Sequence, residues 1–442
     1  MVNKKYLTIF FVVLAVCIVV GVLLGVFLSK KETNNPDSWE LPESSPWYGN
    51  EEIRLFREYL RFPTVHPNIN YEPCVQFLRR QAESLNLPIS VVYPANDKNP
   101  VVIITWTGSE PNLPSIMLNS HTDVVPVYED MWTHPPFAAD VDDDGKIIAR
   151  GTQDTKSLGV TYLAAIRALK LEGEKSLRRT IHVTFVPDEE TGGAQGMAAF
   201  VLSDTFKAMN VGFALDEAGV SPTNVISVYN DERCPWQIEF ICNGPTGHAS
   251  ILYEDTAGEK ISYVVSKLME MRKMELERMK NESLPYGKVT TINLTILKGG
   301  IQANVIPPEL RATFDIRLSV DVDHEEFEAQ LNRWCEEAGG NITINFIVKT
   351  PKAPPSTADS TNPVWVVLQN TTKELGMDVV PTILAGATDM RFLRRLNIPA
   401  FGFSPLINTP ILLHDHNEFV HADEYLAGIK LYTNMLRKLG NI

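Results

Sequence analysis

Short, largely apolar, strand-like runs recur in the first half of the chain. Two of them are VVIITW at 101–106 and SIMLNSH at 115–121, and a run of β-formers follows at 181–186. Runs of this length are typical of strands buried on both faces of a sheet. A segment with helical character, 158–173, ends at a glycine just before the third run. This alternation predicts an α/β fold with helices on both sides of a sheet.

The pattern of the chain changes at Trp236. Four segments now alternate strictly between apolar and polar residues, which predicts strands with one buried and one solvated face. Two amphipathic helices are interspersed, so the order is β-α-β-β-α-β, a ferredoxin-like unit. The strands are WQIEFIC (236–242), TINLTIL (291–297), ATFDIRLSV (312–320) and ITINFIV (342–348), and the helices are 258–280 and 324–339. From about 357 the α/β character returns. We therefore predict a catalytic domain in two parts, 50–235 and 357–442, with an inserted domain at 236–356.

The N-terminus predicts a membrane anchor. Residues 6–28 are 23 positions without a charge, and a helix of this length spans roughly 34 Å, enough for a bilayer core. The run is longer than the apolar region of a cleaved signal peptide. We predict an anchor at 1–30 and a Pro- and Ser-rich linker at 31–49. The positive-inside rule slightly favours a cytoplasmic N-terminus and a lumenal or extracellular catalytic domain; a cytoplasmic catalytic domain is the alternative.

Charge and composition exclude one class of partner. The chain is 44% hydrophobic and 21% charged, as in globular proteins, and its formal net charge is −14. Nucleic acid binding needs clusters of lysine and arginine, and the sequence contains no basic stripe. We therefore expect a small-molecule ligand and no nucleic acid partner.

Acidic and histidine side chains gather where the predicted strands end. The stretch TIHVTFVPDEETGGAQG (180–196) leads a strand directly into three carboxylates. His121, Asp123, Asp216 and Glu217 also lie at the ends of apolar runs, Asp154 lies in a Gly-led loop just before a helix, and His414 and His416 lie far downstream. In open α/β sheets, ligands bind outside the carboxyl ends of the strands. Converging carboxylates repel one another unless cations lie between them. The pattern predicts a divalent metal site, for which His and carboxylate are suitable ligands.

Eight motifs carry a family resemblance. In chain order, they are HTDVVP, RGxQD, VPDEExGG, ALDE, GHAS, NVIP, ATDxR and LLHDH, and the resemblance runs from about residue 50 to the C-terminus. Together they resemble the di-zinc aminoacylase and carboxypeptidase family of metallopeptidases. The resemblance implies a zinc-peptidase-like α/β catalytic domain, an inserted dimerisation or lid domain, a homodimer and two Zn2+ per subunit. This chain departs from the family at Thr155, where Met is common, and in its N-terminal anchor.

The resemblance also implies roles for individual residues. Glu189 would be the general base, Asp123 would orient His121, and His248 would reach the partner's site and stabilise an oxyanion. Substrate contacts would come from Asn304, Arg317 and Arg391. The metal ligands would be His121, Asp154, Glu190, Glu217 and His414, with Asp154 bridging. His416 and Asp216 are the alternatives to His414 and Glu217.

The implied activity is zinc-dependent hydrolysis of the amide bond of N-acyl-L-amino acids to a carboxylate and a free amino acid. Two zinc ions would activate a water, and Glu189 would move its proton to the leaving amine. A dipeptidase or carboxypeptidase with the same di-zinc site is the alternative. A membrane-tethered binding protein without turnover is a third possibility, which loss of Glu189 or of a ligand would favour; none is missing.

Overall fold

The computed structural model describes residues 40–442. The predicted anchor and the first part of the linker, residues 31–39, fall outside these residues. Between 40 and 442, no helix combines the length and the apolar composition needed to cross a bilayer. The anchor therefore stays a prediction.

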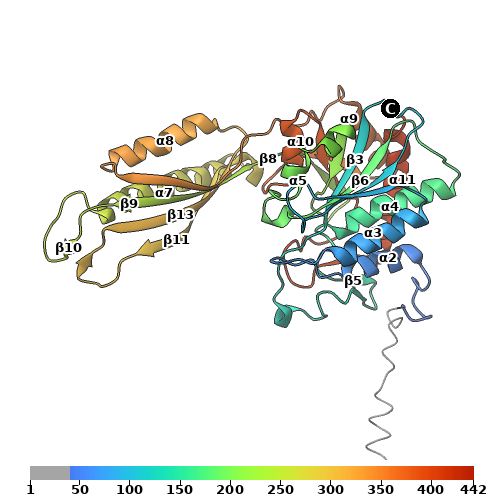
Figure 1. The fold of residues 1–442 in the computed structure, drawn as a ribbon, viewed down its shortest axis with the longest axis horizontal. Coiled ribbons are helices and arrows are strands. Elements are labelled where there is room, and N and C mark those ends of the chain that lie inside the picture. Colours follow the sequence, from blue (N-terminus) through green and yellow to red (C-terminus); the bar gives the residue numbers. More distant parts are fainter. Residues whose placement is uncertain (1–39) are drawn as a thin grey trace, which may run out of the picture. The chain divides into compact units, whose positions relative to one another are not determined.

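An eight-stranded mixed sheet forms the centre of the α/β part (Figure 1). Its strand order is β1-β2-β6-β3-β7-β16-β8-β15. The strands are β1 (Ile89–Val92), β2 (Val101–Trp106), β3 (Ser115–His121), β6 (Ile181–Val186), β7 (Val211–Asp216), β8 (Val225–Glu232), β15 (Asp378–Leu384) and β16 (Ala400–Gly402). The predicted strands 101–106 and 115–121 are confirmed residue for residue. Every residue of β3 and of β6 is buried, as their apolar sequences require.

Three neighbouring strands position the candidate site. Strand β3 pairs in parallel with β6 on one side and with β7 on the other. Their carboxyl ends therefore lie at the same edge of the sheet. These ends are His121, Val186 and Asp216, and each is followed by an acidic or histidine-rich turn.

Helices cover both faces of this sheet, as predicted. On one face, α5, α6 and α10 pack with Val101, Ile103 and Met117 in a common apolar core. On the other face lies α4, where Gly159 sits so close to Phe185 that a Cβ there would be 2.5 Å from its ring. The helices are α2 (Glu51–Leu60), α3 (Glu72–Ser84), α4 (Lys156–Leu171), α5 (Met197–Phe200), α6 (Asp204–Ala208), α9 (Pro363–Glu374), α10 (Met390–Arg395) and α11 (Ala422–Leu439).

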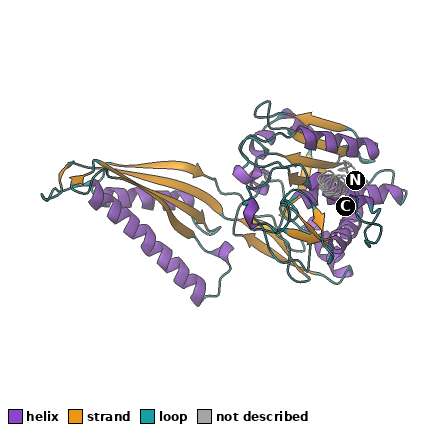
Figure 2. Cartoon of the chain, turned by 90° about the horizontal axis from the view of Figure 1, so that it is seen from below, coloured by secondary structure: helices purple, strands orange, loops and turns teal. Residues whose placement is uncertain are grey.

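The segment after Arg233 folds as the predicted β-α-β-β-α-β unit. Its antiparallel sheet has the order β11-β13-β9-β14, and α7 and α8 cover one face (Figure 2). The alternation of apolar and polar residues explains why the helices cover only one face. Trp236, Ile238 and Phe240 face the helices, while the residues between them stay partly exposed. The elements are β9 (Cys234–Asn243), α7 (Ala257–Asn281), β11 (Thr291–Gly299), β13 (Glu309–Leu318), α8 (His324–Glu337) and β14 (Ile342–Lys349). The domain limits at 236 and 356 remain a prediction.

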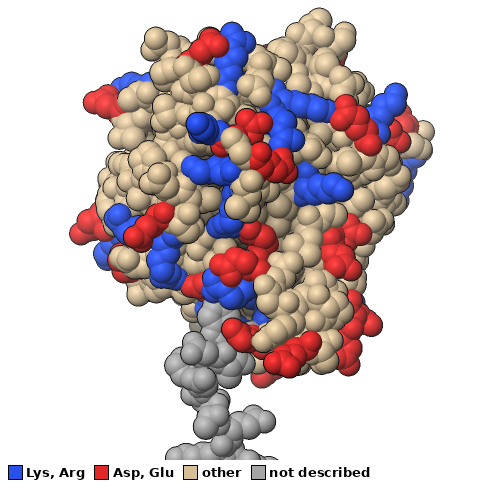
Figure 3. Space-filling view, turned by 90° about the vertical axis from the view of Figure 1, so that its right-hand side faces the viewer, with Lys and Arg blue, Asp and Glu red and all other residues tan. Residues whose placement is uncertain are grey.

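Two small sheets and three 3-10 turns complete the described elements. One sheet joins β4 (Asp140–Val141), β5 (Lys146–Ile148) and β17 (Phe419–His421); the other pairs β10 (Gly247–His248) with β12 (Val305–Ile306). The 3-10 turns are Glu129–Met131, Glu189–Thr191 and Tyr286–Lys288. On the face drawn in Figure 3, acidic and basic side chains are interspersed.

Candidate metal centre

The strand ends bring the predicted ligands together. His121 is the last residue of β3, Glu217 directly follows β7, and Glu190 lies in the turn after β6. Asp154 comes from the loop before α4, and His414 from the loop before β17. The structure thus gathers all five predicted metal ligands from segments that are far apart in the sequence.

Asp154 lies between the two histidines. Its Oδ1 is 3.0 Å from His121 Nε2, and its Oδ2 is 3.0 Å from His414 Nε2. His121 Nε2 is also 3.2 Å from a Glu217 carboxylate oxygen, and His414 Nε2 is 3.2 Å from one of Glu190. One carboxylate therefore faces two separate sets of donors, which is the arrangement expected for a bridging ligand.

The donor set fits divalent cations. The ligand atoms of His121, Asp154 and Glu190 lie within 4.8 Å of one another, and the same holds for His121, Glu189 and Glu217. The Oε1 atom of Glu190 is buried without a hydrogen-bond partner among the described residues. Imidazole and carboxylate suit zinc, and carboxylate also suits harder ions. The residues present therefore fit a metal centre, while the ligand types leave the metal's identity open.

The electrostatics of the cluster also indicate a missing positive charge. Burial raises the pKa of Glu189 and of Glu217 well above the carboxyl range, and Glu217 raises that of Glu189 further. Burial likewise raises the pKa of Glu190, with a contribution from Asp154. Hydrogen bonds to Asp154 and Glu190 raise the pKa of His414 to about 10. These carboxylates outnumber the cations around them, so a bound divalent ion would stabilise their charged forms.

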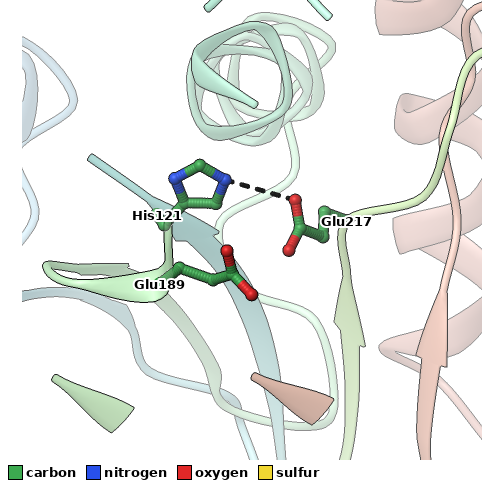
Figure 4. Close-up of side chains that lie close together, drawn as sticks. All are labelled: His121, Glu189 and Glu217. Carbon is green, nitrogen blue, oxygen red and sulfur yellow. Dashed lines mark hydrogen bonds and ion pairs between the residues drawn. The ribbon is translucent and has the colours of Figure 1, made fainter. Parts of the chain in front are cut away.

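The turn after β6 explains why acidic residues and glycines follow a buried strand. Asp188 adopts a left-handed conformation at φ 74°, and its carboxylate accepts hydrogen bonds from the Gln195 N–H and the Thr191 hydroxyl. Gly193 follows with φ 69°, and a Cβ there would lie 2.6 Å from Asp389 Oδ1. In this tight turn consecutive side chains diverge. Glu189 comes close to His121 and Glu217 (Figure 4). Its neighbour Glu190 instead faces His414, with a carboxylate oxygen 3.2 Å from His414 Nε2.

Asp123 holds this turn against β3. Its Oδ1 accepts a hydrogen bond from the Glu189 N–H at 3.2 Å, and its Oδ2 accepts one from the Glu190 N–H at 3.1 Å. His66 Nε2 lies 2.9 Å from the same Oδ2. The predicted orientation of His121 differs in detail, because its Nδ1 bonds the Asp123 carbonyl at 2.8 Å and lies 3.6 Å from the carboxylate. Only Thr122 separates the two residues along the chain, and the backbone carbonyl is nearer than the carboxylate.

A cavity of about 210 Å³ opens beside the cluster. Its polar lining residues are Gln153, Asp154, Glu189, Glu190, Glu217, Thr388 and His414. Its other lining residues are mostly apolar: Ala218, Gly219, Tyr229, Leu384, Gly386, Ala387 and Leu413. None of these lining residues is a lysine or an arginine. Tyr229 and Leu384 were missed by sequence reasoning, because nothing distinguishes them from ordinary strand residues.

The alternative ligands are engaged elsewhere. Asp216 Oδ2 accepts a hydrogen bond from Asn119, and its Oδ1 accepts one from the Glu217 N–H. The His416 ring packs edge-on against Tyr128. Neither belongs to the clusters of metal-ligand atoms in the described residues. His414 is not part of those clusters either, but its Nε2 lies 3.0 Å from Asp154 Oδ2 and 3.2 Å from Glu190 Oε2, so the geometry favours His414 over His416.

Six predicted site residues are not among those that line this cavity; His121 and Asp123 lie beside it in the cluster described above, and the other four lie elsewhere. His248 is exposed on β10 and bonds Ser250 Oγ at 2.8 Å. Asn304 lies in the neighbouring loop, where its carbonyl accepts the Ala249 N–H. Arg317 pairs with Asp315. The fourth, Arg391, is buried and donates hydrogen bonds to the carbonyls of Gly192 and Thr388, so it clamps the acidic turn.

Comparison with known proteins agrees with this architecture. Residues 117–438 match peptidase family M20/M25/M40. The chain is 44% identical over 391 residues to aminoacylase-1 of Mus musculus, an alignment that covers 88% of this chain and 95% of that protein.

Two solved structures share the fold. One is an M20 family metallo-carboxypeptidase from Sulfolobus solfataricus, with a TM-score of 0.68 at 19% identity over 88% of this chain and 99% of that one. The other is a dinuclear metal binding peptidase of family M20 from Bacillus subtilis, with a TM-score of 0.63 at 18% identity over 88% of this chain and 98% of that one. Given the extent of the family match and the identity to its relatives, the chain belongs to peptidase family M20/M25/M40.

Proposed function

We propose that this chain is a metal-dependent amidohydrolase that cleaves N-acyl-L-amino acids to a carboxylate and a free amino acid. The observation that carries the reaction class is the position of Asp154, which presents one carboxylate oxygen to each of two histidines at 3.0 Å. Likeness to aminoacylase-1 over most of the chain supports the substrate class.

We assign the metal to two sites that share Asp154. His121 and Glu217 would hold one ion, and Glu190 and His414 the other; zinc is our choice among the metals that these donors suit. A pair of bound zinc ions would polarise the acyl carbonyl and lower the pKa of a water toward neutrality.

Glu189 is our candidate for the general base. Its carboxylate lies among the donor atoms of His121 and Glu217, but in Figure 4 no hydrogen bond or ion pair joins it to either. It accepts the proton of the attacking water and delivers it to the departing nitrogen, so the C–N bond breaks as the amine is protonated. Asp123 fixes the Glu189 backbone and so aims this carboxylate.

We propose that the apolar residues that line the cavity form the acyl subsite, which binds the acyl group of the substrate. The amino acid half of the substrate carries a carboxylate next to its side chain, and no lysine or arginine lines the cavity to receive it. The uncharged acyl group fits this apolar lining better, since burying an unpaired charge is costly. Asn304, Arg317 and Arg391 remain the proposed contacts for the amino acid half.

Gly386 allows a direct test of the acyl subsite. A Cβ there would meet only Leu384 side-chain atoms, at 3.9 Å, so a larger residue extends into open space. We expect Gly386→Leu to lower kcat/KM for N-octanoyl-methionine roughly 10- to 100-fold by overpacking, with N-acetyl-methionine little affected. Gly386→Ala, which adds one methyl group, is the graded control. Unchanged selectivity between the two acyl groups would place the acyl chain elsewhere.

The function itself is tested by measuring zinc content and hydrolysis together on the full chain. N-acetyl-methionine is compared with the dipeptide Ala-Met at equal concentration. We expect about two zinc ions per subunit and preferential release of methionine from the N-acyl substrate. Faster cleavage of the dipeptide would replace the aminoacylase by the dipeptidase alternative. Absence of both activities with full zinc would favour a binding protein.

We further propose a homodimer in which His248 serves the partner's site. Its exposure, and its absence from the cavity of its own chain, support this. Mixing His248→Ala subunits with Glu189→Ala subunits then leaves one intact site in each mixed dimer. About a quarter of the parent activity should return if random C2 dimers form. If each variant alone and the mixture are equally inactive, the site is not shared.

We also propose that the uncharged run near the N-terminus is a membrane anchor. The absence of charge over residues 6–28 supports a single anchor with a lumenal or extracellular catalytic domain. Release of the full chain from cell membranes by alkaline carbonate would contradict the anchor, and protease protection in sealed vesicles tests its orientation.

A further inference from the structure

A buried ion pair joins the two loops that carry Asp154 and His414. Arg150 Nη1 donates to Glu418 Oε2 at 2.7 Å, and the two side chains are 2% and 0% exposed. Arg150 opens the RGxQD motif, and Glu418 lies four residues after His414. Sequence reasoning gave neither residue a role.

Glu418 organises the backbone that presents Asp154. Its Oε1 accepts hydrogen bonds from the N–H groups of Gln153, at 2.5 Å, and Asp154, at 3.2 Å. Its Oε2 accepts the Gly151 N–H at 3.2 Å, and the Thr152 hydroxyl also donates to the carboxylate. The Glu418 carboxylate thus accepts hydrogen bonds from three backbone N–H groups of one loop, including that of Asp154, the proposed bridging ligand.

Arg150 makes the matching contacts on the other loop. Its Nη2 donates to the His414 carbonyl at 3.4 Å, and its Nη1 also reaches the Asp415 carbonyl at 3.1 Å. Gln153 reinforces the connection, because its side chain bonds the Pro410 and Phe419 carbonyls and the Leu412 N–H. The motif therefore ties one ligand-bearing loop to the other.

Space around the loop is restricted as well. Gly151 has φ 91°, and a Cβ at this position would lie 3.2 Å from side-chain atoms of both Val124 and Lys156. The loop cannot readily take another path if its hydrogen bonds are lost. If the loop shifted, we expect the residues at its end, including Asp154, to move from their positions.

We propose that Glu418 is a positioning residue that, together with Arg150, fixes Asp154 relative to His414 and thereby sets the affinity for the metal these two residues share. This inference rests on the proposed metal centre. Partners that orient metal ligands commonly change metal affinity 10- to 100-fold when removed. A role in fold stability alone would leave the affinity of the folded protein unchanged.

The test is a zinc titration of the metal-free full chain against a chromophoric chelator. Glu418→Gln keeps the size of the side chain but turns an amide N–H₂ toward backbone donors. We expect its zinc affinity at one of two sites to fall at least about tenfold, with the other site less affected. Zinc binding equal to that of the parent would overturn the proposal.

Two further variants separate positioning from stability. Glu232→Gln disrupts a comparable buried pair, Glu232 with Arg394, whose members are 3% and 1% exposed. The Glu232 carboxylate also accepts hydrogen bonds from the N–H and the hydroxyl of Thr388, and neither of these partners is a proposed metal ligand. This variant should lower Tm without changing zinc affinity, and an equal loss of affinity would contradict a specific role for Glu418. Arg150→Lys keeps the charge but loses the fork that reaches His414, and covers the case in which Glu418→Gln does not fold.

Arg150→Lys is expected to weaken zinc binding by a smaller factor than Glu418→Gln, and unchanged affinity would count against the proposal. A parent chain that binds no zinc would overturn the metal centre and this inference with it. That result is distinct from a parent that binds two ions and a Glu418→Gln variant that binds them equally well.

Discussion

Glu189→Gln is expected to reduce hydrolysis of N-acetyl-methionine by roughly 10²- to 10⁴-fold, the range typical of a lost general base. The amide occupies the same space but cannot accept the proton of the attacking water. Burial, with Glu217 next in size, raises the pKa of Glu189. A carboxyl whose pKa lies closer to neutrality is better suited to accept and then return a proton.

Metal content decides between two roles for this residue. Because the Glu189 carboxylate lies among the donor atoms of His121 and Glu217, it is also close enough to act as a ligand. We expect Glu189→Gln to retain the zinc content of the parent, as should Glu83→Gln, an exposed control on α3 with normal activity. Loss of one zinc together with activity would make Glu189 a ligand, and retained activity would place the base elsewhere.

Removal of the metal should abolish activity and make the stability of the fold depend on pH. A ligand present at 1,000 times its Kd stabilises a fold by about 4 kcal/mol per site, so a chelator should lower Tm markedly. Protons are then the cations left to neutralise the cluster. The pKa of Glu190 is raised from 4.5, mainly by burial, and hydrogen bonds to Asp154 and Glu190 raise that of His414 from 6.5 to about 10.

These raised pKa values determine whether the stability of the metal-free fold rises or falls with pH. A group whose pKa is higher in the folded chain stabilises the fold below its unfolded pKa, and this contribution is lost as pH rises through the folded value. The metal-free protein should therefore lose stability from about pH 5 upward, with the His414 contribution fading between 6.5 and about 10. The zinc-loaded protein should change little over this range. Denaturant unfolding at several pH values measures both, and a metal-free protein that gains stability with pH would contradict the assignment.

Local sequence patterns predicted most of the elements. Strand β3 was predictable to the residue because it is buried on both faces, and the βαββαβ unit because period-two alternation records one buried face. The order of strands in the main sheet was not predictable. Strand β2 pairs with β6, about 80 residues later, and no local signal records that choice.

The cluster of histidine and carboxylate side chains was predictable because its chemistry is carried by residue type. The side chains that hold this cluster in place were less predictable. Arg391 clamps the turn through the Gly192 carbonyl, and Glu418 binds backbone N–H groups, which every residue possesses. A main-chain partner leaves no pattern in the sequence. Glu418 lies two residues after the LLHDH motif, but only the folded loop shows which groups its carboxylate binds.

The span between Asp154 and His414 has a consequence for how the enzyme matures. The two ligands are 260 residues apart in the chain. At synthesis rates of roughly 5–20 residues per second, His414 follows Asp154 by about 13–50 seconds. During that interval a nascent chain can hold at most the half of the centre that contains His121 and Glu217. Loading of both proposed sites therefore has to wait until the loop that carries His414 has been synthesised and has docked beside Asp154.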